Sequence, residues 1–164
     1  YFPPEVGATQ TRAVEMATTL VERGHSVTML TEFPNHPHGI IPRPYRGKLC
    51  VVEHYRGIDV VRSWVYARPQ KTFVTRMGFY LSFMTTSILT GSVLSGQYDV
   101  VYATSPPFFV GVSGLLLSRI RTIPFVFEVR DLWPQSAVEL GELNNPHFIR
   151  WSEKLERQYY RSAA

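Results

Sequence analysis

Three short apolar runs, separated by segments with helical periodicity, constrain the fold of this chain more than any other feature. They are residues 28–31 (TMLT), 99–103 (DVVYA) and 125–129 (FVFEV). Runs that are apolar on both faces are typical of strands in a parallel sheet covered by helices. Alternation of such strands with helices indicates the α/β class. We therefore expect strands near 26–31, 98–103 and 124–129 in one parallel sheet flanked by helices.

The remaining segments predict further elements. Strand-like patterns over residues 49–55 and 58–64, with Arg56-Gly57 at the corner, predict a β-hairpin. Thr9 is placed to cap the first helix, and Gly24 is placed to end it. Apolar spacing predicts helices over about 9–23, 72–94, 108–119, 134–140 and 146–161.

Composition narrows the class of protein. A chain of 164 residues is the length of one ordinary domain. The net charge of +4 comes from scattered basic residues and not from a Lys/Arg-rich run, which argues against nucleic acid as a partner. Cys50 is the single cysteine, so no internal disulfide can form and a reducing, cytoplasmic setting is expected. Residues 77–94 are the most apolar stretch, but their serines and threonines favour a buried or membrane-surface helix over a spanning one.

Unusual residues gather in loops that adjoin the expected strands and helices. Gly7 precedes a helix N-terminus, where backbone N–H groups can bind a phosphate; a simple turn is the alternative. No GxGxxG or Walker A motif is present, so standard nicotinamide or ATP binding loses support. Arg130 can hold a phosphate or carboxylate and Asp131 can accept a proton; the alternative is a structural Arg–Asp pair. His36 and His38 lack a third metal ligand nearby, which favours an acceptor-binding loop over a metal site.

Three segments resemble the N-terminal domain of glycosyltransferase family 4 (group 1) enzymes. They are residues 1–37 (YFPPEVGATQTRAVEMATTLVERGHSVTMLTEFPNHP), 103–111 (ATSPPFFVG) and 124–141 (PFVFEVRDLWPQSAVELG). The subgroup that these segments resemble builds bacterial surface polysaccharides such as lipopolysaccharide, and it includes N-acetylfucosamine transferases. The resemblance implies that residues 1–164 form a single Rossmann-like domain, the acceptor-binding half of a GT-B fold. The family's first strand and its C-terminal donor domain are expected to lie outside this chain.

The same resemblance implies a function. Family members are generally retaining enzymes that move a sugar from a nucleotide-sugar donor to an acceptor, here expected to be a lipid-linked glycan. No cofactor or metal is implied, the C-terminal domain is the expected partner, and the fragment alone is expected to be inactive. A nucleotide-sugar epimerase-like enzyme and a non-catalytic membrane-docking module remain the alternatives. The implied site residues are Asp131 and Arg130 for catalysis, Gly7, Ala8 and Thr9 for the donor phosphate, and Glu5, His36, His38, Ser105 and Trp133 for the acceptor.

A basic and aromatic segment suggests a membrane surface as a further partner. Arg68, Lys71 and Arg76 stand at the start of residues 66–94, and several aromatic residues follow them. A helix of this composition can lie on an anionic bilayer, whereas the alternative is a helix packed on the sheet with its aromatics in the core. We therefore expect a cytoplasmic enzyme, peripheral at the inner face of the cell membrane.

Overall fold

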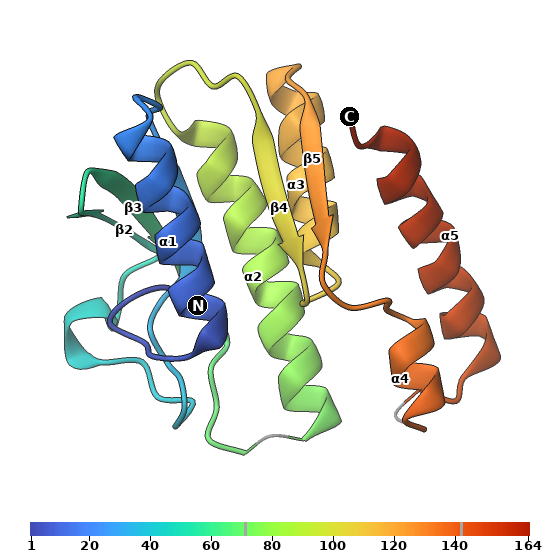
Figure 1. Cartoon of the computed structure of the whole chain (residues 1–164). Coiled ribbons are helices and arrows are strands. Elements are labelled where there is room, and N and C mark those ends of the chain that lie inside the picture. Colours follow the sequence, from blue (N-terminus) through green and yellow to red (C-terminus); the bar gives the residue numbers. More distant parts are fainter. Residues whose placement is uncertain (71, 142) are drawn as a thin grey trace. The chain divides into compact units, whose positions relative to one another are not determined.

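A computed structural model describes residues 1–70, 72–141 and 143–164. Its elements alternate between helices and strands, as the apolar runs predicted (Figure 1). The chain divides into two compact units, residues 1–91 and 92–164. In chain order the elements are α1 (Ala8–Glu22), β1 (Thr28–Glu32), a 3-10 turn (Arg43–Tyr45), β2 (Cys50–Tyr55), β3 (Ile58–Ser63), α2 (Phe73–Val93), β4 (Val101–Ser105), α3 (Val110–Arg121), β5 (Phe125–Val129), α4 (Gln135–Glu139) and α5 (Pro146–Ser162).

The first unit contains a three-stranded sheet in the order β1-β3-β2. Strand β1 runs parallel to β3, and β2 runs antiparallel to β3. The predicted hairpin is confirmed, because β2 and β3 are joined at Arg56 and Gly57, which both have positive φ angles, 49° and 78°. Two consecutive positive φ angles characterise the type I′ turn, whose twist matches that of the flanking strands. Helix α1 packs against β3.

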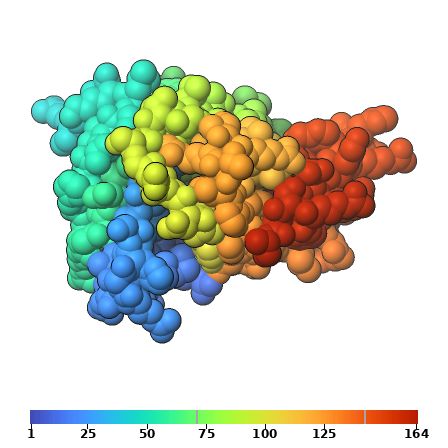
Figure 2. Space-filling model, turned by 90° about the horizontal axis from the view of Figure 1, so that it is seen from above, coloured from blue at the N-terminus to red at the C-terminus, as the bar shows by residue number. Residues whose placement is uncertain are grey.

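The second unit is built on the parallel pair β4–β5. Helix α3 connects the two strands and packs against both of them (Figure 1). Helix α5 packs against α3 and β5, and much of it is visible at the surface on the face drawn in Figure 2. The predicted α/β class, with parallel strands flanked by helices, is therefore confirmed.

The expectation of a single sheet is wrong. Strand β1 belongs to the three-stranded sheet, whereas β4 and β5 form a separate two-stranded sheet, and no pairing joins the two sheets among the described residues. Apolar runs show that a strand is buried, but they do not specify its neighbour, because any exposed strand edge offers the same backbone donors and acceptors. The expected strand over 98–103 both begins and ends later, at Val101 and Ser105, so Thr104 and Ser105 belong to β4 and not to the loop after it.

The helices were predicted within two residues at each end, but the cap of α1 was misplaced. Gly7 is the N-cap and Thr9 lies inside the first turn, because the helix already begins at Ala8. Gly24, with a φ of 86°, follows the end of the helix in the left-handed conformation that was expected of it.

The apolar core of the first unit ties the N-terminal loop to the sheet. Phe2 is fully buried with Val14, Ala17, Ile58 and Val60. This cluster joins the N-terminal loop, α1 and β3, and burial of each large apolar side chain contributes about 1.5–3 kcal/mol. The loop that follows Phe2 is therefore anchored at its start.

Two glycines allow α3 to approach its neighbours closely in the second unit. A Cβ atom at Gly114 would lie 2.5 Å from the Phe125 ring and 2.7 Å from Ala103. At Gly111 it would lie 2.6 Å from the ring of Tyr159 in α5. The small residues on this helix thus decide how near the aromatic side chains of β5 and α5 can lie.

Candidate functional site

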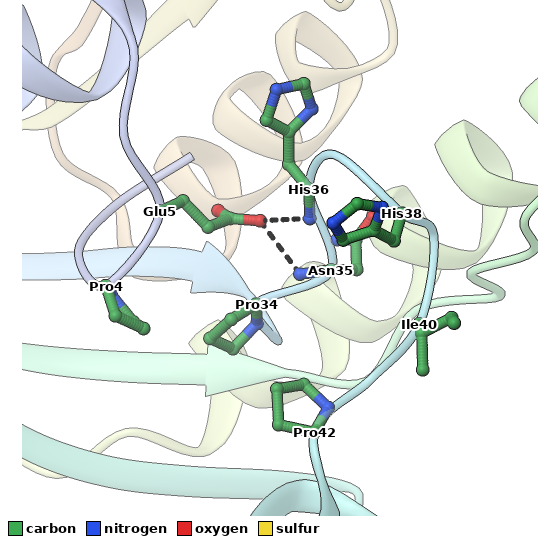
Figure 3. A pocket seen from close by; sticks show the side chains of 8 residues that line it. All are labelled: Pro4, Glu5, Pro34, Asn35, His36, His38, Ile40 and Pro42. Atoms are coloured by element: carbon green, nitrogen blue, oxygen red, sulfur yellow. Dashed lines mark hydrogen bonds between the residues drawn. The ribbon is translucent and has the colours of Figure 1, made fainter.

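A pocket opens in the first unit beyond the carboxyl end of β1. It has a volume of about 400 Å³, and two loops form it, one before α1 and one after β1 (Figure 3). Prolines and an isoleucine provide apolar walls, and a carboxylate, an amide and two imidazoles provide polar groups. The lining residues are Pro4, Glu5, Pro34, Asn35, His36, His38, Ile40 and Pro42. Three of the residues that were predicted to bind the acceptor, Glu5, His36 and His38, are thus brought together.

Glu5 holds the two loops of the pocket to each other. Only 6% of the surface of this residue is exposed. Its Oε1 atom accepts hydrogen bonds from the backbone N–H groups of Asn35 and His36, each at 2.8 Å (Figure 3). Its Oε2 atom is buried and has no hydrogen-bond partner among the described residues. Hydrogen bonds from N–H groups to an ionised carboxylate are stronger than neutral ones, so this contact fixes the backbone on which His36 is carried.

Tyr1 adds a polar group beside this pocket that sequence reasoning treated only as part of a loop. Its ring centroid lies 5.1 Å from that of His36. Burial, together with the carboxylates of Glu32 and Glu5, raises the pKa of the Tyr1 phenol to about 12. The phenol therefore keeps its proton at neutral pH and can donate a hydrogen bond.

The predicted phosphate-binding residues begin α1. Gly7 is the N-cap with an extended backbone, and its carbonyl accepts hydrogen bonds from the amide (2.9 Å) and the hydroxyl (3.1 Å) of Thr11. A Cβ atom at Gly7 would meet nothing within 4 Å, so open space and not close packing surrounds this position. The first N–H groups of a helix lack partners within it, and at Ala8 and Thr9 they accordingly stand at an accessible helix end.

The predicted catalytic residues follow β5 in the second unit. The guanidinium of Arg130 donates from Nε to the Thr104 hydroxyl at 3.0 Å and from Nη2 to the Pro106 carbonyl at 3.3 Å. Its backbone N–H donates to the carbonyl of Ser105. Arg130 therefore fastens the loop after β4. Asp131 is exposed, and among the described residues no ion pair joins it to Arg130. The alternative of a structural Arg130–Asp131 pair is thus not found.

Ser105 and Trp133 lie in packed surroundings in the same unit. Ser105 is the last residue of β4 and is 2% exposed. The Trp133 ring lies 4.3 Å from that of Phe108 and meets Phe148 edge-on at 6.2 Å. These ring contacts place Trp133 in an aromatic cluster. Because Trp133 is only half-buried, part of its surface remains open to a ligand.

A comparison with known families identifies the kind of domain that carries this pocket and these strand ends. The sequence model described as "Glycosyl transferase 4-like domain" matches residues 7–164. The chain belongs to this family. No curated protein and no solved structure is significantly similar to it. A glycosyltransferase domain acts on a sugar donor and an acceptor, so the polar loops of this glycosyltransferase 4-like domain are candidate sites for those substrates.

The structure describes two of the three residues of the glycosyltransferase 4-like domain that were expected to dock on a membrane, Arg68 and Arg76. Lys71 lies outside the described residues. The guanidinium of Arg68 lies over the Tyr66 ring at 5.1 Å, and Arg76 lies in the first turn of α2. In the described part of the chain no helix is long and apolar enough to cross a membrane.

Arg62 is a buried charged residue of this glycosyltransferase 4-like domain that was not expected from the sequence. Arg62 lies in β3, is 2% exposed, and donates from Nε to Glu53 at 2.7 Å. The Tyr45 hydroxyl donates to the other carboxylate oxygen of Glu53 at 2.7 Å. The sequence signal was the arginine that follows two valines in the strand IDVVRS, because a charge buried there requires a partner.

Proposed function

We propose that the chain is the acceptor-binding half of a retaining GT-B glycosyltransferase that takes its sugar from a nucleotide-sugar donor. The observation that carries the acceptor assignment is the pocket between the loop before α1 and the loop after β1. Its proline-rich walls suit the C–H faces of a sugar ring, and the imidazoles of His36 and His38 can exchange hydrogen bonds with hydroxyl groups. Its position beyond the carboxyl end of a parallel strand is the usual place for a ligand in α/β domains.

The remaining assignments follow the family resemblance. The helix end at Gly7, Ala8 and Thr9 binds the donor phosphates, since open space and the N–H groups at a helix N-terminus suit an anion. Asp131 acts in catalysis through its exposed carboxylate, and its neighbour Arg130, whose guanidinium holds the loop after β4, assists it. Ser105 and Trp133 contribute to binding of the acceptor. The acceptor is a lipid-linked glycan of a surface polysaccharide, and the reaction requires no metal or cofactor.

Peripheral docking on a membrane is a second part of this proposal. Helix α2 exposes several apolar side chains, and Arg68 is exposed just before it. The exposed apolar residues of the helix are Phe73, Val74, Leu81, Leu89 and Val93. An anionic bilayer at the inner face of the cell membrane would attract the basic residues and receive the apolar ones.

Replacement of the two histidines tests the acceptor assignment. In the full-length enzyme, His36→Ala combined with His38→Ala should raise the acceptor KM about 30-fold, since each of the two lost hydrogen bonds is worth about 1 kcal/mol. The donor KM should stay within twofold of that of the unchanged enzyme. His25→Ala is the matched control, because His25 is exposed just after α1 and outside the pocket. An unchanged acceptor KM in the double variant would place the acceptor elsewhere.

A further inference from the structure

Arg62 is a buried cation in the middle of the sheet of the first unit. It lies in the central strand β3, opposite Thr31 of β1 and Val51 of β2. Only 2% of its surface is exposed. Burying a charge in this way costs free energy unless partners compensate it, so the contacts of Arg62 show what it does.

The contacts of the Arg62 guanidinium extend beyond its strand. Nε donates to Glu53 Oε2 at 2.7 Å, which compensates the charge within the sheet. Nη2 donates to the backbone carbonyl of Pro3, which lies 59 residues earlier in the chain. The guanidinium also lies 5.9 Å from the centre of the Tyr45 ring. One hydrogen bond of Arg62 therefore serves the loop before α1 and not the sheet.

A second step of hydrogen bonding connects that loop to the loop after β1. Pro3 is followed by Pro4 and Glu5, which both line the pocket. Glu5 Oε1 in turn accepts the N–H groups of Asn35 and His36 at 2.8 Å (Figure 3). A single residue, Pro4, thus separates Pro3, which Arg62 contacts, from Glu5. Movement of the Pro3 carbonyl would be transmitted to the backbone of the loop that carries His36.

We propose that Arg62 is a positioning residue for the pocket, acting through the Pro3 carbonyl and Glu5 on the loop over residues 35–38. Its effect on acceptor binding rests on the proposed function. A purely stabilising role does not account for this arrangement, because replacing a buried ion pair by apolar residues is often neutral or stabilising. Arg62 has several donors in a fixed fork, which lets it bind Glu53 and the Pro3 carbonyl at once; an apolar residue could not do so.

Amide hydrogen exchange of the chain, followed by NMR, tests the proposal without an activity assay. The amides to follow are those of Asn35 and His36, and the Phe33 amide is the internal reference because it donates to Ser63 within the sheet at 2.9 Å. Arg62→Met should accelerate exchange at Asn35 and His36 at least tenfold relative to Phe33. Arg62→Lys keeps one charged contact, so it should give a smaller acceleration of about threefold and carries the test if Arg62→Met does not fold.

Two further variants separate positioning from general stability. Val61→Ala removes buried apolar volume from the same strand but lies outside the core cluster around Phe2, and it should leave the ratio to Phe33 within twofold. Glu5→Ala removes the second step and should accelerate the same two amides. Acceleration limited to the Arg62 and Glu5 variants supports the proposal. Equal ratios in the Arg62 and Val61 variants, or no change at Asn35 and His36 in either Arg62 variant, would overturn it.

Kinetics of the full-length enzyme then address the function separately. Arg62→Lys should raise the acceptor KM at least threefold while the donor KM stays within twofold. If exchange accelerates but the acceptor KM does not move, Arg62 positions the loop and the pocket is not the acceptor site. If exchange does not accelerate, the positioning role fails whatever the kinetics show.

Discussion

At the scale of single residues, the hydrogen bonds of Glu53 make the stability of the first unit depend on pH. Burial raises the pKa of Glu53, but the hydrogen bonds from Arg62 and Tyr45 outweigh it and hold the pKa below the ordinary 4.5. A carboxyl group whose pKa is lowered by folding stabilises the folded state above its unfolded pKa. That contribution is lost as the pH falls through the lower, folded value.

We therefore expect Glu53→Gln to lower the free energy of unfolding at pH 7. The difference from the unchanged chain should shrink as the pH falls below about 4.5, since Glu53 then becomes protonated in both states. Urea unfolding at several pH values measures this difference. Glu22→Gln is the control because Glu22 is exposed at the end of α1. A difference that does not vary with pH would show that the Glu53 carboxylate is not stabilised by folding.

At high pH, the stability of the first unit depends on Tyr45. Burial and the hydrogen bond to Glu53 raise the pKa of its phenol above the ordinary 10.0. A raised phenol pKa contributes stability that is fully present below the unfolded pKa and is lost as the pH rises through the folded one. The pH range of greatest stability for this group of side chains therefore lies between the two titrations.

Arg130 and Asp131 are neighbours in sequence, but their contacts predict different consequences of replacement. Asp131→Asn should lower kcat of the full-length enzyme by about 100-fold or more if its carboxylate transfers a proton, and should leave Tm unchanged. Arg130→Gln should lower stability by about 1–2 kcal/mol, because its hydrogen bonds to Thr104 and Pro106 are lost. Steady-state kinetics and thermal unfolding of the two variants measure both effects. A turnover preserved within a few-fold in Asp131→Asn would remove Asp131 from the catalytic machinery.

At the scale of elements, the segment that leads into α2 is the part expected to meet a membrane. Three basic residues, Arg68, Lys71 and Arg76, precede or begin a helix with exposed apolar residues. The full-length enzyme should co-sediment with vesicles that contain anionic lipid and should be released as salt rises, because each basic residue near such a surface contributes about 1 kcal/mol. Replacing all three by Gln should weaken binding at least tenfold without unfolding the protein.

A charge-matched variant controls for the loss of net charge. Replacing Arg23, Lys48 and Arg157 by Gln removes the same number of charges from exposed positions elsewhere. This variant should bind anionic vesicles nearly as well as the unchanged enzyme. Equal binding to neutral and anionic vesicles, or equal losses in the two triple variants, would contradict docking through the α2 segment.

At the scale of the whole molecule, residues 1–164 should suffice for acceptor binding but not for sugar transfer. A protein made only of residues 1–164 should bind the acceptor glycan, since the pocket lies within the first unit. It should not transfer sugar, because stabilising the departing diphosphate requires donors from a second domain in the GT-B arrangement that we propose. Titration with acceptor followed by tryptophan fluorescence, and a transfer assay with a panel of nucleotide sugars, check the two halves of this prediction. Turnover by residues 1–164 alone would refute it.

Local sequence was sufficient for the type of each α-helix and β-strand. Apolar spacing predicted the helices, and the Arg56-Gly57 corner predicted the hairpin, because backbone preferences and the exposure of one face act over a few residues. The same reasoning, with the family resemblance, selected Glu5, His36 and His38, and these residues do line one pocket. It did not predict that Oε1 of Glu5 is engaged by backbone N–H groups instead of being free for a ligand.

Only the tertiary structure decided which strands pair and which distant residues support the pocket. The edge of β1 is satisfied by β3, and the Pro3 carbonyl by Arg62, 59 residues away. Strand edges and carbonyl groups are chemically alike along the chain, so their partners depend on how the elements pack and not on local pattern. The sequence by itself therefore determined the α/β elements and the polar loops, while packing determined the two sheets and the buried arginine that holds the pocket.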